Sequence, residues 1–265
     1  MLASLIVTLR LNKAWDNYKS IGGKSPLHEL TDLLVAKLNI MLPDYFITTA
    51  MRYTSPFAQT AIARIQKENI KDVILLPLYP QYSTTTTKSS IDDFIEKSNE
   101  AFNISIVEPF YKNEIYNKAI CDQIINVQSK YNDFHLIFSA HGLPQKTVDK
   151  GDPYQSQIEE HIELLKEKLS HYATNIKSIN LAYQSKVGPQ KWLSPNLNNM
   201  LTNFRNKKVI IYPISFIVDN SETVFELDVE YRELAKKLQV KEYRVCSCVN
   251  DNDTFVEALK EIVSL

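Results

Sequence analysis

Residues 134–144, Phe134-His135-Leu136-Ile137-Phe138-Ser139-Ala140-His141-Gly142-Leu143-Pro144, decide the fold that the sequence predicts. An apolar run ends here in a histidine and a glycine. Similar short runs rich in valine and isoleucine recur along the chain, separated by longer stretches of helical periodicity. This alternation is typical of repeated βα units that build a mostly parallel sheet, so we predict an α/β fold. The predicted strands are Tyr45–Ala50, Asp72–Tyr79, Asn103–Val107, Phe134–Ser139, Ser178–Tyr183 and Lys208–Phe216.

Apolar spacing also predicts how these elements are buried. Val73-Ile74-Leu75-Leu76 and Val209-Ile210-Ile211 are continuous apolar runs, as expected for strands that are covered on both faces. Spacings of three and four residues predict two amphipathic helices. Their apolar positions are Leu27, Leu30, Leu34 and Leu38 in the first, and Ile158, Ile162, Leu165 and Leu169 in the second. Ser90, three residues before Asp93, predicts a helix start after the polar loop of residues 83–89.

The charge of the chain argues against a nucleic-acid partner. Its 265 residues include 30 basic and 31 acidic side chains, so there is no basic surplus to neutralise phosphates. The three cysteines, Cys121, Cys246 and Cys248, favour a reducing cytoplasm over a disulfide framework. Cys246 and Cys248 leave two interpretations open, a metal ligand pair and ordinary strand residues, and the lack of a nearby fourth ligand favours the second.

The first eleven residues, Met1 to Leu11, are strongly apolar. They have no basic start and no small-residue cleavage site, and they are too few to span a bilayer. A buried helix face and a hydrophobic lip in peripheral contact with a membrane are both compatible with this pattern. The first interpretation is favoured.

Ligands of doubly wound sheets bind at the carboxyl ends of the strands, so residues directly after the strands are the candidates for chemistry. His141 ends a predicted strand, and Gly142 allows the backbone to turn beside it. A histidine that simply bonds to a neighbouring loop is the alternative. His28, His135, His161 and His171 lie in predicted helices or inside a strand, and an ordinary structural role is expected for them.

An acidic stripe follows the strand that we predict over Lys208–Phe216. Glu222, Glu226 and Glu230 recur every four residues and share one helix face, where like charges destabilise the helix slightly. The alternative is that Glu222 forms a capping box with Asp219 and that the other two are solvated. Spacing alone does not separate the two interpretations.

Aromatic side chains follow two further strands. Met51-Arg52-Tyr53 and Pro77-Leu78-Tyr79-Pro80-Gln81-Tyr82-Ser83 each come directly after one. Arg52 could form a fork with a ligand carboxylate, and the tyrosines could cover a flat apolar ring. As isolated observations these are weak, because both residue types are common at loop edges.

Taken together, these segments resemble the ferrochelatase family. The resemblance runs in the family's order from about residue 15 to the end, which makes the set of motifs specific. The matching stretches are Ile21-Gly22-Gly23-Lys24-Ser25-Pro26-Leu27, Met51-Arg52-Tyr53, Leu78-Tyr79-Pro80-Gln81-Tyr82-Ser83, Ser139-Ala140-His141-Gly142-Leu143-Pro144, Gly151-Asp152-Pro153-Tyr154, Tyr183-Gln184-Ser185-Lys186-Val187-Gly188-Pro189, Lys191-Trp192-Leu193, Glu222-Thr223 and Glu226-Leu227-Asp228.

The resemblance implies two similar Rossmann-like halves, residues 1–125 and 126–265, with a porphyrin cleft between them and the C-terminal helix packed on the first half. It implies insertion of Fe²⁺ into protoporphyrin IX to form haem, the last step of haem biosynthesis. His141 and Glu222 would then face each other at the metal-insertion site, with Glu226 and Glu230 behind them. The porphyrin pocket would be lined by Arg52, Tyr53, Tyr79, Tyr82, Ser83 and Trp192.

The resemblance also implies partners and departures. Protoporphyrin IX and Fe²⁺ are the expected substrates, with no permanently bound cofactor, and three cysteines argue against the four-cysteine iron–sulfur cluster of some members. Members usually begin with a strand that ends in Gly-Gly-Pro, which has no counterpart in Met1 to Asp16, and Asn220 replaces a frequent second histidine. Two alternatives therefore stay open, a non-catalytic porphyrin-binding or haem-binding remnant and a chelatase for another metal or tetrapyrrole. The expected location is the cytoplasm, as a monomer or homodimer.

Overall fold

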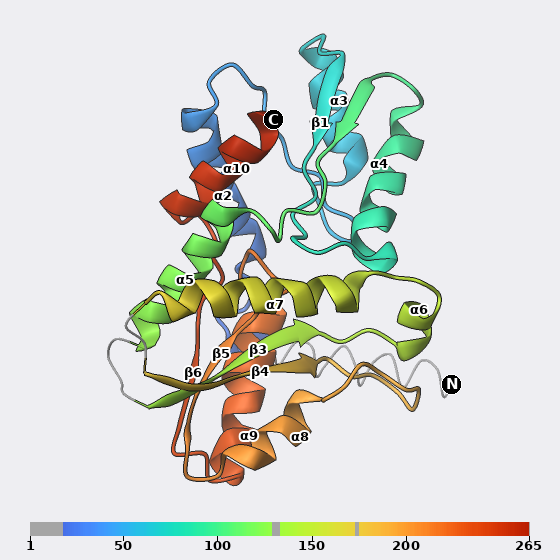
Figure 1. The fold of residues 1–265 in the computed structure, drawn as a ribbon. Helices are drawn as coiled ribbons and strands as arrows, with labels where there is room; N and C mark the ends of the chain where they lie inside the picture. Colours follow the sequence, from blue (N-terminus) through green and yellow to red (C-terminus); the bar gives the residue numbers. More distant parts are fainter. Residues whose placement is uncertain (1–17, 129–132, 173–174, 265) are drawn as a thin grey trace.

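The computed structural model describes residues 18–128, 133–172 and 175–264. They form an α/β structure with two parallel sheets (Figure 1). The apolar start at Met1 to Leu11 lies outside the described residues. In the part of the chain that the structure describes, no helix combines the length and the apolarity needed to cross a bilayer.

The larger sheet has the strand order β4-β3-β5-β6, with all neighbours parallel. β3 (Phe134–His141) lies between β4 (Ile176–Gln184) and β5 (Lys208–Tyr212), and β6 (Glu242–Val245) is the neighbour of β5. Because the strands are parallel, the carboxyl ends of β3, β4 and β5 lie at one edge of the sheet. The register places His141 opposite Gln184.

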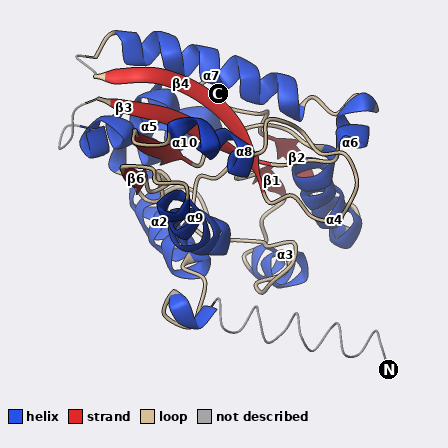
Figure 2. Cartoon of the chain, turned by 90° about the horizontal axis from the view of Figure 1, so that it is seen from below, coloured by secondary structure: helices blue, strands red, loops and turns tan. Residues whose placement is uncertain are grey.

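Helices cover both faces of this sheet, as the continuous apolar strands require (Figures 1 and 2). Leu136 and Phe138 point to one face, where they share a core with α5 (Glu114–Gln128), α7 (Tyr154–Ser170) and α10 (Asp253–Ser264). Ile137 points to the opposite face, toward α8 (Leu197–Leu201) and α9 (Tyr231–Lys237). Side chains alternate between the faces of a strand, so one strand contributes to both cores.

The smaller sheet pairs β1 (Asp72–Leu75) with β2 (Asn103–Ile106). α3 (Ala58–Lys67) and α4 (Ser89–Ser98) pack with it around Val73 and Phe94. Ile74 and Ile106 remain about two-fifths exposed, at 40% and 42%. The two strands are thus covered well on one face only.

α2 (Leu27–Met41) belongs to the core of the larger sheet. It buries Leu34 and Leu38 and packs on α10, where Lys37 bonds to Asp251 and Asp253. α10 also packs along α5. The predicted apolar faces of α2 and α7 are confirmed, since all eight predicted positions belong to the main core or pack against it. α6 (Gln145–Asp149) follows β3, and a short 3₁₀ turn, η2 (Thr202–Phe204), follows α8.

Several predicted strand boundaries are wrong, and proline explains two of them. The strand predicted over Asp72–Tyr79 ends at Leu75, shortly before Pro77. The strand predicted over Lys208–Phe216 ends at Tyr212, directly before Pro213. Proline lacks the backbone N–H that pairs with a neighbouring strand. A strand predicted from an apolar run is therefore too long wherever a proline lies in that run.

The strand predicted at Tyr45–Ala50 is absent, because the segment has no ladder partner among the described residues. The real strands β3 and β4 extend further than predicted, to His141 and Gln184. β6 was expected only indirectly, from the interpretation of Cys246 and Cys248 as ordinary strand residues, and that interpretation is wrong because the strand ends at Val245. Cys246 and Cys248 lie just after this strand and are buried.

The predicted helix start at Ser90 is also wrong. A π-helical turn, η1 (Thr84–Lys88), precedes α4, and Ser83 caps it by accepting a hydrogen bond from the Thr85 N–H. Ser90 therefore lies within the first turn of α4.

Candidate active site

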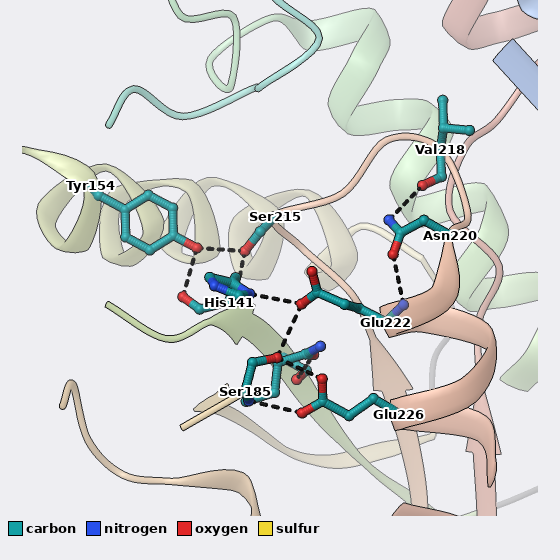
Figure 3. Close-up of polar contacts among 10 residues, drawn as sticks. His141, Tyr154, Ser185, Ser215, Val218, Asn220, Glu222 and Glu226 are labelled. Carbon is teal, nitrogen blue, oxygen red and sulfur yellow. Dashed lines mark hydrogen bonds and ion pairs between the residues drawn. The ribbon is translucent and has the colours of Figure 1, made fainter. Parts of the chain in front are cut away.

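The site forms where β3, β4 and β5 end, as the doubly wound arrangement predicts (Figure 3). His141 is the last residue of β3. Its neighbour Gly142 has no room for a side chain, because an added Cβ would lie 2.6 Å from the Gln184 carbonyl oxygen. The Gly142 N–H donates to that same oxygen at 2.9 Å. Glycine is thus required here for close approach to β4, and not for the sharp turn that we predicted.

The backbone of His141 is fixed by two side chains (Figure 3). Its N–H donates to the Ser215 hydroxyl at 2.9 Å, and its carbonyl accepts from the Tyr154 hydroxyl at 3.0 Å. The two hydroxyls lie 2.7 Å apart. Since Tyr154 donates its only proton to the carbonyl, Ser215 donates to Tyr154, and the ring closes with every donor used. Tyr154 begins α7 and Ser215 follows β5, so residues from two other parts of the fold hold the backbone of the histidine.

His141 and Glu222 form the centre of the site. The His141 Nδ1 lies 2.8 Å from the Glu222 Oε2, and the two side chains are 37% and 36% exposed. Both groups are therefore anchored in the protein and still open to a ligand. This contact confirms the predicted proximity of two residues that are far apart in the chain.

The two charges act on each other's protonation. Partial burial lowers the pKa of His141, but the hydrogen bond and the charge of Glu222 outweigh it and raise the pKa overall. Burial raises the pKa of Glu222, and here the bond to His141, the charge of His141 and the bond from Ser185 outweigh it and lower the pKa. The pair therefore favours imidazolium and carboxylate when no substrate is bound.

Ser185 links Glu222 to Glu226. Its N–H donates to the Glu226 Oε1 at 2.9 Å, and its hydroxyl lies 2.6 Å from the Glu226 Oε2 and 3.0 Å from the Glu222 Oε2. One hydroxyl carries one proton, so both contacts are satisfied together when one carboxyl is protonated. Burial, assisted by the charge of Glu222, raises the pKa of Glu226.

Ser185 also has an unusual backbone. Its φ is 63°, in the left-handed region that residues other than glycine rarely adopt. The sequence motif Gln184-Ser185-Lys186 was recognised, but no role was predicted for Ser185. Its place directly after a strand is the signal that could have identified it.

The glutamates project from a π-helix, η3 (Glu222–Glu230). Such turns are rare and are found frequently at functional sites. The Asn220 side chain caps its start by accepting from the Glu222 N–H at 2.8 Å. The capping box between Asp219 and Glu222 is therefore wrong, because Asp219 instead accepts from the Cys248 N–H and from Asn250.

The other predicted site residues differ in their exposure and in their contacts. Glu230 ends η3 and is exposed. Arg52 pairs with Asp93 at 3.2 Å and stacks on Tyr53, a residue that is 79% exposed. Within the described residues, therefore, part of the Arg52 guanidinium group contacts Asp93.

Tyr79 and Tyr82 are half-buried in the loop after β1, whereas Ser83 is buried and its hydroxyl donates to Asp152. Ser83 thus supports the loop and does not present its hydroxyl to solvent. Trp192 is half-buried beside Gly142, and its Nε1 donates to the Val187 carbonyl.

The three thiols are separate from this site. Cys121, Cys246 and Cys248 are free and buried, and burial raises the pKa of each. Across residues 18–128, 133–172 and 175–264, no three His, Cys, Asp or Glu side chains cluster in a way that could hold a metal. His141 and Glu222 are a pair, and a pair suits a metal that is passed on more than one that is kept.

Known proteins that are similar in sequence belong to one family. The family model described as Ferrochelatase matches residues 1–265. The ferrochelatase of Sulfurimonas denitrificans is 47% identical, with 99% of this chain and 85% of that protein covered. The ferrochelatase of Helicobacter pylori (strain ATCC 700392 / 26695) is 42% identical, with 99% and 80% covered.

Solved structures add the fold. SirB from Bacillus subtilis with Fe3+ superposes with a TM-score of 0.61 at 12% identity, covering 87% of this chain and 86% of that one. CbiX, described as the terminal enzyme for biosynthesis of siroheme in denitrifying bacteria, gives a TM-score of 0.59 at 11% identity, with 90% and 92% covered. At such identities the likeness shows the fold alone, and it confirms the predicted α/β chelatase-like class. By its sequence over its whole length, the chain belongs to the ferrochelatase family.

Proposed function

We propose that this protein inserts Fe²⁺ into protoporphyrin IX to form protohaem. The observation that carries this proposal is the pair of His141 and Glu222, 2.8 Å apart and partly open to solvent at the carboxyl ends of the central strands. Metallation removes two pyrrole protons and exchanges the water ligands of iron for nitrogens. A histidine and a carboxylate can accept protons and bind the metal weakly enough to release it.

The roles of the other residues follow from their positions. His141 is the proposed proton acceptor, and His141 with Glu222 contacts the iron. Glu226, tied to Glu222 through Ser185, and the exposed Glu230 continue the line of carboxylates away from the pair. This line provides a route for protons or for iron. Arg52, Tyr53, Tyr79, Tyr82 and Trp192 are the proposed porphyrin contacts, with Ser83 supporting the loop of Tyr82.

The partners, the cellular location and the oligomeric state also belong to this proposal. Protoporphyrin and ferrous iron are the partners, iron is a substrate, and no permanently bound cofactor or iron–sulfur cluster takes part. The proposed location is the cytoplasm. Peripheral contact with a membrane is an alternative that suits a hydrophobic substrate. The protein acts as a monomer or homodimer, without nucleic acid.

An absorbance titration tests the function against its alternatives. Purified protein is titrated with protoporphyrin while the Soret band is followed, and Fe²⁺ is then added without oxygen. Conversion of porphyrin to haem over many turnovers supports the proposal. Binding without turnover favours a non-catalytic remnant, and preferential insertion of cobalt or nickel into another tetrapyrrole favours a different chelatase.

A further inference from the structure

The loop after β1 carries two of the proposed porphyrin contacts, Tyr79 and Tyr82. The turn that follows it provides part of its support, because Gln81 and Ser83 bond to Thr85 and Thr87. Its strongest contacts go to α7 and to the turn that precedes α7. We call residues 79–84 the tyrosine loop. Gly151-Asp152-Pro153-Tyr154, the motif that begins α7, has no role in the catalytic site apart from Tyr154.

Asp152 is the main contact of the tyrosine loop. Its Oδ2 accepts from the Ser83 hydroxyl at 3.0 Å, from the Thr84 N–H at 2.7 Å and from the Thr84 hydroxyl at 2.6 Å. Its Oδ1 accepts from the Tyr154 N–H at 3.0 Å, at the start of α7. The side chain is 6% exposed and faces four donors. Only an acceptor on both oxygens satisfies this arrangement.

Two further contacts fix the same loop. The Tyr82 N–H donates to the Gln157 Oε1 at 2.6 Å. Gln81 is 2% exposed and donates through Nε2 to the His161 Nδ1 at 2.8 Å. His161 then donates through Nε2 to the Asn117 Oδ1 at 2.8 Å. Burial lowers the pKa of His161 to about 3, so the ring is neutral and has one donor and one acceptor, as this chain requires.

We propose that Asp152 is a positioning residue for porphyrin binding, which fixes the tyrosine loop on α7 together with Gln157 and His161. This inference rests on the proposed function, in which Tyr79 and Tyr82 contact the porphyrin. Residues 152–161 also deliver Tyr154 to the carbonyl of His141 at 3.0 Å. This one segment therefore fixes the position of the tyrosine loop relative to the catalytic histidine.

The first test replaces Asp152 by Asn, which keeps the shape but turns an NH₂ group toward donors. We expect the KM for porphyrin to rise about tenfold or more, because charge-assisted bonds are lost, while kcat changes by less than about threefold. Asp149→Asn is the matched control, because the exposed Asp149 carboxylate accepts, among the described residues, from the Gln145 side chain alone. An unchanged KM would overturn the proposal. So would a fall in kcat that is fully explained by a smaller fraction of folded protein.

A second pair of variants avoids the buried carboxylate. Thr84 is exposed, so Thr84→Val removes one donor to Asp152 without disturbing the core, and Thr84→Ser retains that donor. We expect the valine variant to raise the porphyrin KM about threefold to tenfold and the serine variant to restore it. Equal KM values for the two variants contradict the inference.

Hydrogen exchange separates this inference from the proposed function. The amides of Tyr82 and Thr84 both donate to acceptors on or before α7, so they should exchange slowly in the free protein. Asp152→Asn should accelerate exchange at both, and Asp149→Asn at neither. This result supports the positioning of the loop even if the wild-type protein fails to metallate porphyrin. Unchanged protection in Asp152→Asn overturns it.

Discussion

The His141 Nδ1 lies 2.8 Å from the Glu222 Oε2, although the two residues are 81 positions apart in the chain. The contact depends on the parallel sheet, because His141 ends β3 and Glu222 begins the π-helix that follows β5. It joins a base to a carboxylate at the edge where α/β proteins bind their ligands.

The pH dependence of catalysis should report this contact. Glu222 raises the pKa of His141, so the neutral base forms only at a correspondingly higher pH. In Glu222→Gln we expect a lower maximal rate. We also expect the acidic limb of kcat/KM to move to lower pH, because the Glu222 carboxylate no longer raises the pKa of His141. Initial rates of Zn²⁺ insertion from pH 5 to 9 measure the limb. A limb that stays in place would show that another group titrates there.

Ser185 should matter more than its neighbours. Ser185→Ala removes the hydroxyl that bridges Glu222 and Glu226 but keeps the N–H bond to Glu226. We expect kcat to fall about tenfold with little change in the porphyrin KM, since an interaction at the reacting groups is lost.

Ser139→Ala is the control for this variant. Ser139 donates to Gln184, directly beside Ser185, and does not contact either carboxylate. If both serine variants lose activity equally, the bridge has no special role.

The buried His161 should make the fold sensitive to acid. Its pKa is about 3 in the folded protein and about 6.5 in the unfolded chain. Between these values the unfolded state binds an additional proton, so this contribution is fully present above about pH 6.5 and is lost as the pH falls. The loss approaches about 1.4 kcal/mol per pH unit.

Urea unfolding at several pH values between 4 and 7.5 measures this slope. His161→Gln should be less stable at pH 7.5 and show a flatter pH dependence, because glutamine does not titrate. His171→Gln, at an exposed position on the same segment, should retain the wild-type slope. A wild-type slope in His161→Gln would contradict the assignment.

The sequence predicted the parts of the fold that depend on local pattern. The apolar positions of α2 and α7 and the existence of β1 to β5 follow from period and burial alone. The strand ends before Pro77 and Pro213 were missed because the apolar run outweighed the proline signal. Tyr45–Ala50 failed for a different reason, since a strand exists only where a neighbour pairs with it.

The site was predicted in its residue types but not in its connections. Strand ends and family motifs pointed to His141 and Glu222, but only the register of β3 and β4 brings Ser185 beside them. Asp152 was recognised as part of a motif, and its partners Ser83 and Thr84 are 68 or more positions away. Contacts of such sequence separation are set by topology, which no local pattern encodes.

The central claim is that this protein is a chelatase in which His141 is essential for metal insertion. The direct measurement is anaerobic insertion of Fe²⁺ into protoporphyrin by the wild-type protein and by His141→Ala, with circular dichroism to establish folding and a Soret titration to establish porphyrin binding. We predict turnover by the wild type, and a folded variant that binds porphyrin with nearly unchanged affinity and forms no haem. Near-normal haem formation by His141→Ala would contradict the account.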